Sequence, residues 1–190
     1  LPVAVSAAER ERLARGEVVV RLAAPDARGL REGLALRVLD TPPERLARAL
    51  TDFAHYPEWA PYVARATPRA LADGSVEQEQ RLDLPAPVTD RHFRLHFDTA
   101  RASPGAPWQM RWRLVPRSGN LRDHRGAWGL AGLGDGRTLA WCRVYVDPGG
   151  RVPAWLVNRT VARALPWILD GLRQQAHRWR YDPRAPPDAP

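Results

Sequence analysis

The side chains best suited to catalysis in this chain are an adjacent acid and histidine, Asp123 and His124, in "RDHRGAW". A carboxylate that orients an imidazole is a common arrangement for a general base. The segment is strand-like, however, and neighbouring residues of a strand point to opposite faces, so we do not expect a dyad. His124 is therefore the general-base candidate by itself. The sequence contains no nucleophile elbow, phosphate loop or zinc spacing, which leaves catalysis uncertain and favours a non-catalytic role.

Two further histidines, His92 and His96, share one face of the strand-like segment "DRHFRLHFD". Their spacing corresponds to about 13 Å along a strand, which is too far for both to bind one metal ion. The single cysteine, Cys142, lies in "TLAWCRVYV" and is typical of a small buried residue rather than a nucleophile. We therefore expect neither a metal nor a cofactor.

Asp90 and Arg91, in "PVTDRHF", are the charged residues that we include among the candidate ligand contacts. At the end of a tunnel, such a pair could hydrogen-bond a headgroup or a hydroxyl group. The alternative is structural, because a pair of this kind also ties the end of a strand to a neighbouring loop. The sequence leaves both roles open.

Alternating apolar and polar residues predict the strands that would position these side chains. Two runs near 17–22 and 34–40 predict a first hairpin, and at least five further strands follow near 75–84, 90–98, 107–115, 121–133 and 136–147. Gly134-Asp135-Gly136 predicts a hairpin turn between the last two strands. The residues expected to face inward, and to line any cavity, are Phe93, Phe97, Trp108, Met110, Trp112, Ala140, Cys142 and Val144.

Helical periodicity predicts three helices. Ser6, with Glu9 three residues later, predicts a capped lead-in helix, and Thr41 before two prolines predicts the cap of a second helix. A long amphipathic helix starts at Pro153. The members of its apolar stripe that we expect to face the ligand are Leu156, Leu165, Ile168 and Leu172. A long helix covering one antiparallel sheet is an α+β layout, which encloses either a solid core or a cavity.

Composition limits the partners. The 190 residues suit one globular domain, and the net charge is +8. All the basic residues are Arg and they are spread along the chain, so we expect no nucleic acid partner. Diffuse positive charge does favour transient contact with an anionic membrane. The sequence starts at Leu1 rather than at Met, which favours a periplasmic or secreted protein from which a leader has been removed.

Three segments carry a resemblance to a known family: "DTPPERLARALTDFAHYPEWAPYV", "LPAPVTDRHF" and "GDGRTLAWCRVYVDPGGRVPAWLVNRTVARALPWIL". They resemble the START-domain branch of the START and Bet v 1-like (SRPBCC, helix-grip) superfamily, which also includes polyketide cyclases. His92 departs from the pattern, because many START domains have a second acid there. The resemblance implies a helix-grip fold, in which a curved antiparallel sheet wraps a C-terminal helix around an internal hydrophobic tunnel.

The resemblance and the residues together favour non-catalytic binding and transfer of a lipid, sterol or isoprenoid. Two alternatives stay open. One is a polyketide cyclase or aromatase, and the other is a protein- or membrane-interaction module with a filled core. The expected organisation is a lead-in helix at 1–15, a START-like ligand-binding domain at 16–180 and a Pro-rich tail at 181–190.

Overall fold

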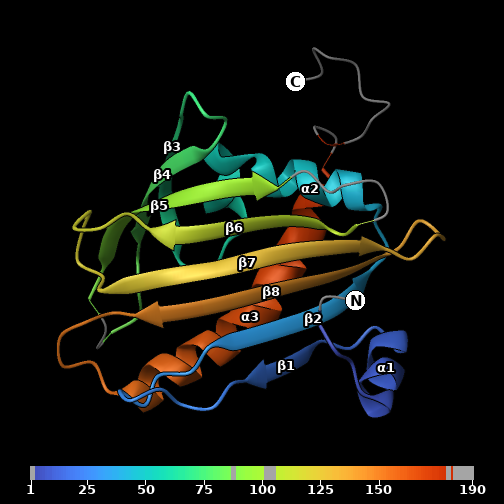
Figure 1. The fold of residues 1–190 in the computed structure, drawn as a ribbon, viewed down its shortest axis with the longest axis horizontal. Coiled ribbons are helices and arrows are strands. Elements are labelled where there is room, and N and C mark those ends of the chain that lie inside the picture. The colour runs from blue at the N-terminus through green and yellow to red at the C-terminus, as the bar shows by residue number, and fades with distance from the viewer. Residues whose placement is uncertain (1–2, 87–88, 101–105, 179–180, 182–190) are drawn as a thin grey trace.

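The computed structural model describes residues 3–86, 89–100, 106–178 and 181. Within these ranges the chain forms one sheet, three α-helices and a short 3₁₀ helix (Figure 1). In chain order the elements are α1 (Ala7–Ala14), β1 (Val19–Leu22), β2 (Gly33–Leu39), α2 (Pro43–Thr51), the 3₁₀ helix η1 (Phe53–Glu58), β3 (Val63–Ala70), β4 (Val76–Leu82), β5 (Arg91–Ala100), β6 (Trp108–Leu114), β7 (Asp123–Gly132), β8 (Thr138–Asp147) and α3 (Ala154–Ala176).

The sheet has eight strands in the order β1-β2-β8-β7-β6-β5-β4-β3, and every neighbouring pair is antiparallel. From β3 to β8 it is a meander, and the β1–β2 hairpin joins it through β2 and β8. In Figure 1, α3 crosses behind the sheet and covers one face, which we call the inner face. The expected α+β helix-grip fold is confirmed.

Strand β3 is the strand that the sequence analysis missed. It lies at the edge of the sheet, contains Pro68, and most of its side chains are exposed. Proline is tolerated on an edge strand because the missing N–H faces solvent. With little burial on either face, β3 has no apolar alternation to reveal it.

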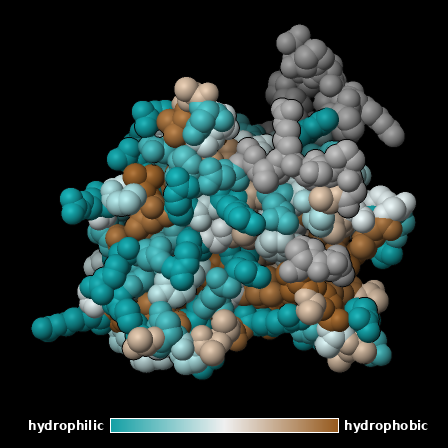
Figure 2. All heavy atoms as spheres, in the orientation of Figure 1, coloured by the Kyte–Doolittle hydropathy of each residue, from teal (hydrophilic) through white to brown (hydrophobic). Residues whose placement is uncertain are grey.

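Apolar side chains are buried on both faces of part of the sheet. The main core fills the space between the inner face, α2 and α3. A smaller cluster forms on the outer face, where Leu13 of α1 packs with residues of the neighbouring strands, including Leu36 and Trp141. Figure 2 shows an outer face that is mostly hydrophilic, with a hydrophobic band beside α1. The lead-in helix therefore shields the outer face of β1, β2 and β8.

The sequence predicted the N-terminal cap of α1 correctly but not that of α2. The Ser6 and Glu9 capping box of α1 is present as expected. The prediction that Thr41 caps α2 is wrong, because the N-cap is Pro42 and no side chain caps this helix. Thr41 is buried, its hydroxyl lies 3.2 Å from Nε2 of His177, and its carbonyl accepts a hydrogen bond of 2.6 Å from Thr138. Thr41 thus joins the start of α2 to β8 and to the end of α3.

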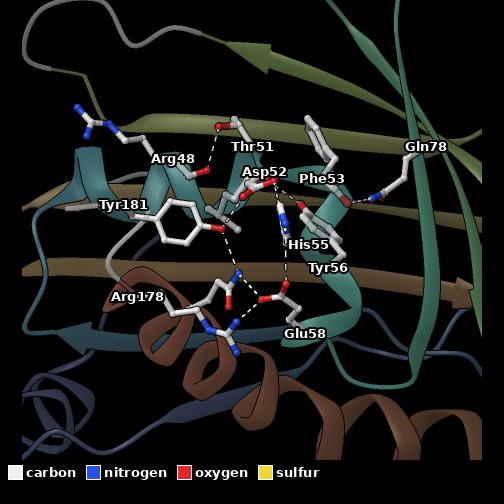
Figure 3. Close-up of polar contacts among 12 residues, drawn as sticks. Arg48, Thr51, Asp52, Phe53, His55, Tyr56, Glu58, Gln78, Arg178 and Tyr181 are labelled. Atoms are coloured by element: carbon white, nitrogen blue, oxygen red, sulfur yellow. Dashed lines mark hydrogen bonds and ion pairs between the residues drawn. The ribbon is translucent and has the colours of Figure 1, made fainter. Parts of the chain in front are cut away.

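Tyr181, where we expected the tail to begin, belongs to the packed core. Its ring is buried, and its hydroxyl donates to Asp52 at 2.7 Å while accepting from Gln175 at 3.0 Å (Figure 3). Tyr181 therefore packs against the end of α3 and the residue that precedes η1. The rest of the expected tail, 182–190, lies outside the described residues.

Candidate functional site: an apolar cavity under the long helix

A cavity of about 190 Å³ lies between the inner face of the sheet and α3. Strands β4 to β8, one side of α3 and the loop that follows η1 supply its wall. The wall residues are Tyr56, Trp59, Ala60, Pro61, Tyr62, Val63, Gln80, Leu82, Leu84, Phe93, Leu95, Phe97, Trp112, His124, Trp128, Cys142, Val144, Val146, Thr160, Val161, Ala164, Leu165 and Ile168.

The wall carries no formal charge at neutral pH. Among the described residues the wall contains no Asp, Glu or Arg, and burial lowers the pKa of His124 to about 4, so the imidazole is neutral. Burial likewise raises the pKa of the Cys142 thiol and of the Tyr56 hydroxyl, so both keep their protons. An ion in this cavity would find no counter-charge on the wall, which makes the space suited to uncharged, apolar molecules.

Three polar wall side chains already donate hydrogen bonds within the protein. The amide of Gln80 donates to Gln78 at 2.6 Å, the Tyr56 hydroxyl donates to the carbonyl of Leu50 at 2.8 Å, and the Thr160 hydroxyl donates to the carbonyl of Leu156 at 2.8 Å. Each of these donors therefore has a partner within the protein and holds its side chain in place on the wall.

His124 is the one sequence-derived catalytic candidate, and it lies on the cavity wall. Asp123 does not orient it, because that carboxylate pairs with Arg125 on the same strand. The imidazole instead packs against the rings of Phe93 and Trp112, with centroids 5.4 and 6.1 Å away. With a pKa near 4 and no carboxylate beside it, this histidine is a weak base at neutral pH. Among the described residues no cluster of His, Cys, Asp and Glu could hold a metal ion.

Gly126 makes room for the indole of Trp112. The two residues are opposite each other in the β6–β7 ladder, and a Cβ at Gly126 would lie 2.2 Å from the Trp112 ring and 2.3 Å from the carbonyl oxygen of Arg143. A side chain is therefore excluded at this position. The missing Cβ leaves space for the indole, whose ring centroid lies 6.1 Å from that of His124.

The structure brings together some of the sequence-derived candidates. Those on the cavity wall are Phe93, Phe97, Trp112, His124, Cys142, Val144, Leu165 and Ile168.

Other candidates are not on the wall. Met110, Ala140 and Leu172 are fully buried in the solid part of the core. Helix α2 packs against β7 and α3, so that part of the inner face is filled by protein. Trp108 and Leu156 are only partly buried and also lie off the wall.

The charged candidates are not wall residues either. Arg91 is buried, and its guanidinium donates to the carbonyl and the hydroxyl of Thr89 at 2.7 and 2.6 Å. Asp90 is exposed, lies 3.3 Å from Arg81 and accepts through its backbone carbonyl from Asn120. Asp90 and Arg91 therefore do not form a pair at the end of the cavity. Asp90 joins the start of β5 to Arg81 of β4 and to Asn120, whereas Arg91 bonds the residues just before it in the chain.

The loop at 59–63 contributes five wall residues that the sequence analysis did not assign to the ligand site. Trp59 packs against the ring of Tyr56, with centroids 5.0 Å apart, and Tyr62 adopts a positive φ of 64°. Such a backbone is costly for a residue other than glycine and is held by the surrounding structure. The signal in the sequence was the aromatic corner "YPEWAPY", in which two prolines end the helical run.

A polar network holds this corner against the end of α3 (Figure 3). Nδ1 of His55 lies 2.6 Å from Asp52, and its Nε2 lies 3.8 Å from Glu58. Glu58 in turn forms an ion pair with Arg178, just beyond the end of α3. The loop that borders the cavity is therefore anchored through Glu58, the residue just before it.

An antiparallel sheet that grips a C-terminal helix above an apolar cavity defines a START-like protein. The chain belongs to the polyketide cyclase / dehydrase and lipid transport family, whose model matches residues 35–177. This confirms the resemblance to the START and Bet v 1-like superfamily. A curated but uncharacterized protein of Pseudomonas aeruginosa is 32% identical over 104 residues. That match covers 52% of this chain and 52% of the relative, so it spans about half the length of each.

Solved structures with the same fold include carriers and enzymes. The STAR-related lipid transfer protein of Xanthomonas axonopodis has a TM-score of 0.76 at 23% identity, over 85% of this chain and 94% of that one. Human STARD10 has a TM-score of 0.72 at 19% identity, over 84% and 69% of the two chains. Zhui aromatase/cyclase of Streptomyces sp. R1128 has a TM-score of 0.57 at 13% identity, over 84% and 95%. At these identities the likeness shows the fold alone.

Proposed function

We propose that this protein binds one uncharged apolar molecule, such as a lipid, sterol or isoprenoid, in the cavity beneath α3 and transfers it without chemical change. The observation that carries the proposal is the cavity wall, which is apolar and free of formal charge. Burial of apolar ligand surface supplies roughly 25 cal/mol per Å², so affinity needs no reactive group. The STAR-related lipid transfer protein of Xanthomonas axonopodis, which has the same fold, supports the same reading.

The volume of the cavity limits the size of the ligand that it can hold. Its volume of about 190 Å³ is below the roughly 300–1,000 Å³ of pockets that hold drug-sized ligands. A molecule as large as a sterol therefore requires the 59–63 loop and α3 to move apart. Smaller apolar molecules fit the cavity as it stands.

Cyclase chemistry is the alternative that the fold also allows, because an aromatase/cyclase is among the neighbours. His124 is its candidate base. The low pKa of this imidazole and the absence of an orienting carboxylate favour binding over catalysis.

The exposed side of α3 supports delivery to a membrane. Trp155 and Trp167 are 64% and 55% exposed, and the exposed Arg159 and Arg163 lie between them at intervals of four residues. Indole rings at headgroup depth, combined with cations, are typical of helices that lie on anionic membranes. No helix among the described residues is long and apolar enough to cross one.

The experiment that tests the function is native mass spectrometry of the purified protein, followed by organic extraction. We expect one retained neutral lipid or isoprenoid per chain, or uptake of one Nile red molecule by the empty protein. A protein that retains nothing and binds neither Nile red nor the smaller naphthalene contradicts the proposal. A ligand that leaves chemically altered contradicts the non-catalytic part and points to the cyclase alternative.

A further inference from the structure

A groove of about 520 Å³ lies on the outer face of the sheet, across β6, β7 and β8. Helix α3 and the apolar cavity are on the inner face (Figure 1), so the groove opens on the opposite side of the sheet. Four of the residues that line it are arginines: Arg111, Arg113, Arg125 and Arg143. All four are exposed, and the proposed function gives them no role.

The groove forms where β7 has short side chains and its neighbours have long ones. Ala127 points to the outer face and lies opposite Arg111 of β6 and Arg143 of β8. The next outward position on β7 is Gly129, where a Cβ would lie 2.0 Å from the indole of Trp141. A small residue with an arginine on either side therefore forms the middle of the groove.

The middle of the groove is basic. Arg113 of β6 lies opposite Arg125 of β7, and like charges in this position repel each other. None of the residues 109–113, 125–129 and 141–145, which the structure describes in full, is acidic. An anion bound here would therefore relieve repulsion between neighbouring arginines.

Three acidic side chains lie around the groove, on β5, before β2 and at the start of β7. Their ion pairs are Asp98 with Arg113 at 3.0 Å, Glu32 with Arg143 at 3.3 Å, and Asp123 with Arg125. Exposed pairs of this kind contribute little stability, so an anionic partner can compete for the arginines. Arg111 has no ion pair among the described residues, although Asp98 lies opposite it in the ladder.

The chemistry of these side chains selects a peptide that carries carboxylates. A guanidinium group binds a carboxylate through two parallel hydrogen bonds. Arg111 and Arg113 are two residues apart on β6, roughly 6.6 Å along the strand, which is also the spacing of alternate side chains in an extended peptide. An extended segment with alternate acidic residues therefore matches this row of arginines.

Two other anionic partners fit the groove less well. A nucleic acid duplex carries one charge about every 1.7 Å along its axis, so its backbone would continue over the acidic side chains around the groove. A membrane surface is broad and would bring its anionic headgroups against the same acids. A short peptide segment avoids both conflicts.

We propose that this groove is a docking site for an acidic, extended segment of a partner protein. The carboxylates of that segment bind the four arginines of the groove. The site does not depend on the proposed function, because it lies on the other face of the sheet. A partner bound there leaves α3 uncovered, so docking and ligand binding can occur together.

The test uses a short fluorescein-labelled peptide in which glutamate alternates with glycine. Its affinity for the full chain is measured by fluorescence anisotropy at low ionic strength, and the same peptide with glutamine in place of glutamate controls for the dye and the backbone. The groove variant is Arg111→Gln combined with Arg143→Gln. Its matched control, Arg65→Gln combined with Arg117→Gln, removes the same charge from exposed arginines outside the groove. A third variant, Ala127→Gln, fills the middle of the groove without changing the charge.

We expect the glutamate peptide to bind the wild type and the glutamine peptide not to bind. Affinity should fall about 10-fold in the groove variant, which corresponds to the loss of two exposed ion pairs. The control should lose less than about 2-fold, because only long-range attraction is removed. Ala127→Gln should weaken binding although its charge is unchanged. Circular dichroism establishes that each variant is folded, and Nile red binding should be the same in all of them.

Three results would overturn the docking site. Equal losses in the groove variant and its control, or unchanged binding in Ala127→Gln, would show that the peptide responds only to the net charge. A glutamate peptide that does not bind the wild type would contradict the proposal directly. A labelled oligothymidylate that binds more tightly than the peptide, and loses affinity in the groove variant, would assign the groove to nucleic acid instead. Nile red reports on the cavity alone, so these results are distinguishable from a failure of the proposed function.

Discussion

The side-chain amide of Gln78 donates a hydrogen bond of 2.6 Å to the carbonyl oxygen of Phe53 (Figure 3). Gln78 is fully buried on β4, and Phe53 is the first residue of η1. The carbonyl oxygen of the same side chain accepts from Gln80, a cavity wall residue. One glutamine thus joins the sheet, the aromatic corner and the cavity wall.

We expect Gln78→Leu to destabilise the protein by about 2 kcal/mol, because the carbonyl of Phe53 and the amide of Gln80 both lose a buried partner. The measurement is the free energy of unfolding from urea titration, followed by circular dichroism. Gln174→Leu is the matched control, since Gln174 is exposed on α3. We expect the control to change stability by less than about 0.5 kcal/mol. Equal values for the two variants would contradict the role given to Gln78.

A Cβ at Gly126 meets the Trp112 ring, so we expect Gly126→Ala to cost about 1–3 kcal/mol through overpacking. Gly132 on the same strand provides the control, because a Cβ there would meet nothing nearer than Pro43 at 3.5 Å. Chemical denaturation of both variants tests this expectation. A Gly126→Ala protein as stable as Gly132→Ala would show that the indole of Trp112 does not need the space.

Filling the cavity should remove binding without unfolding the protein. Val144 lies on the wall, so Val144→Phe should weaken Nile red binding at least about 10-fold, because apolar area for the ligand is lost. Val38 is a matched control, since it is also a partly buried strand valine but packs in the outer-face cluster. We expect Val38→Phe to bind the probe as the wild type does. Unchanged binding in Val144→Phe would contradict the location of the ligand.

The buried imidazole of His124 predicts a loss of stability in acid. Its pKa is about 4 in the folded protein and about 6.5 in the unfolded chain. Above pH 6.5 it is neutral in both states. Between these values only the unfolded chain takes up the proton, so stability falls as the pH is lowered, by on the order of 2 kcal/mol at pH 5.

The check is the free energy of unfolding at pH 7 and pH 5 in wild type, His124→Gln and His92→Gln. We expect the acid-induced loss to be smaller in His124→Gln by roughly 2 kcal/mol. The exposed His92 serves as the control. If His124→Gln loses as much stability in acid as the wild type, this imidazole is solvated or paired in the folded state.

Membrane contact through α3 is tested by removing its exposed indoles. We expect Trp155→Ser combined with Trp167→Ser to lower co-sedimentation with phosphatidylglycerol-containing vesicles about 10-fold, because both rings lose contact with the interface. Leu22→Ser with Leu133→Ser removes exposed apolar side chains elsewhere. Binding that is lost in this control, or kept in the tryptophan variant, would contradict a membrane-facing α3. Higher salt should weaken the wild-type binding, since arginine contributes to it.

The alternation of apolar and polar residues in the sequence was sufficient to predict the central strands and the residues that point inward from them. It also placed two glutamines, Gln78 and Gln80, on the inner face, and the structure shows why they are tolerated there. Each makes a hydrogen bond inside the core, a feature that depends on the aromatic corner and not on the strand. Local patterning therefore predicts which way a side chain points but not which partner it meets.

The sequence did not predict which of the inward-facing residues line the cavity. Met110 and Ala140 share a face with wall residues but lie in the filled part of the core. Which part is filled depends on where α2 packs, a tertiary relationship that no single segment encodes. Leu139 and Trp141 likewise point to the outer face and are buried because α1 and its neighbouring residues cover them.

The order of the strands has a consequence for synthesis on the ribosome. The hairpin β1–β2 is made first, yet its neighbour in the sheet is β8, with Gly33 opposite Val144. Until β8 has been translated, β2 presents an unpaired edge and an uncovered apolar face. Contacts so distant in sequence form slowly and leave nascent chains prone to aggregation. Closure of this sheet therefore waits for β8, and a chain stopped before β8 lacks the strand that joins β1 and β2 to the rest of the sheet.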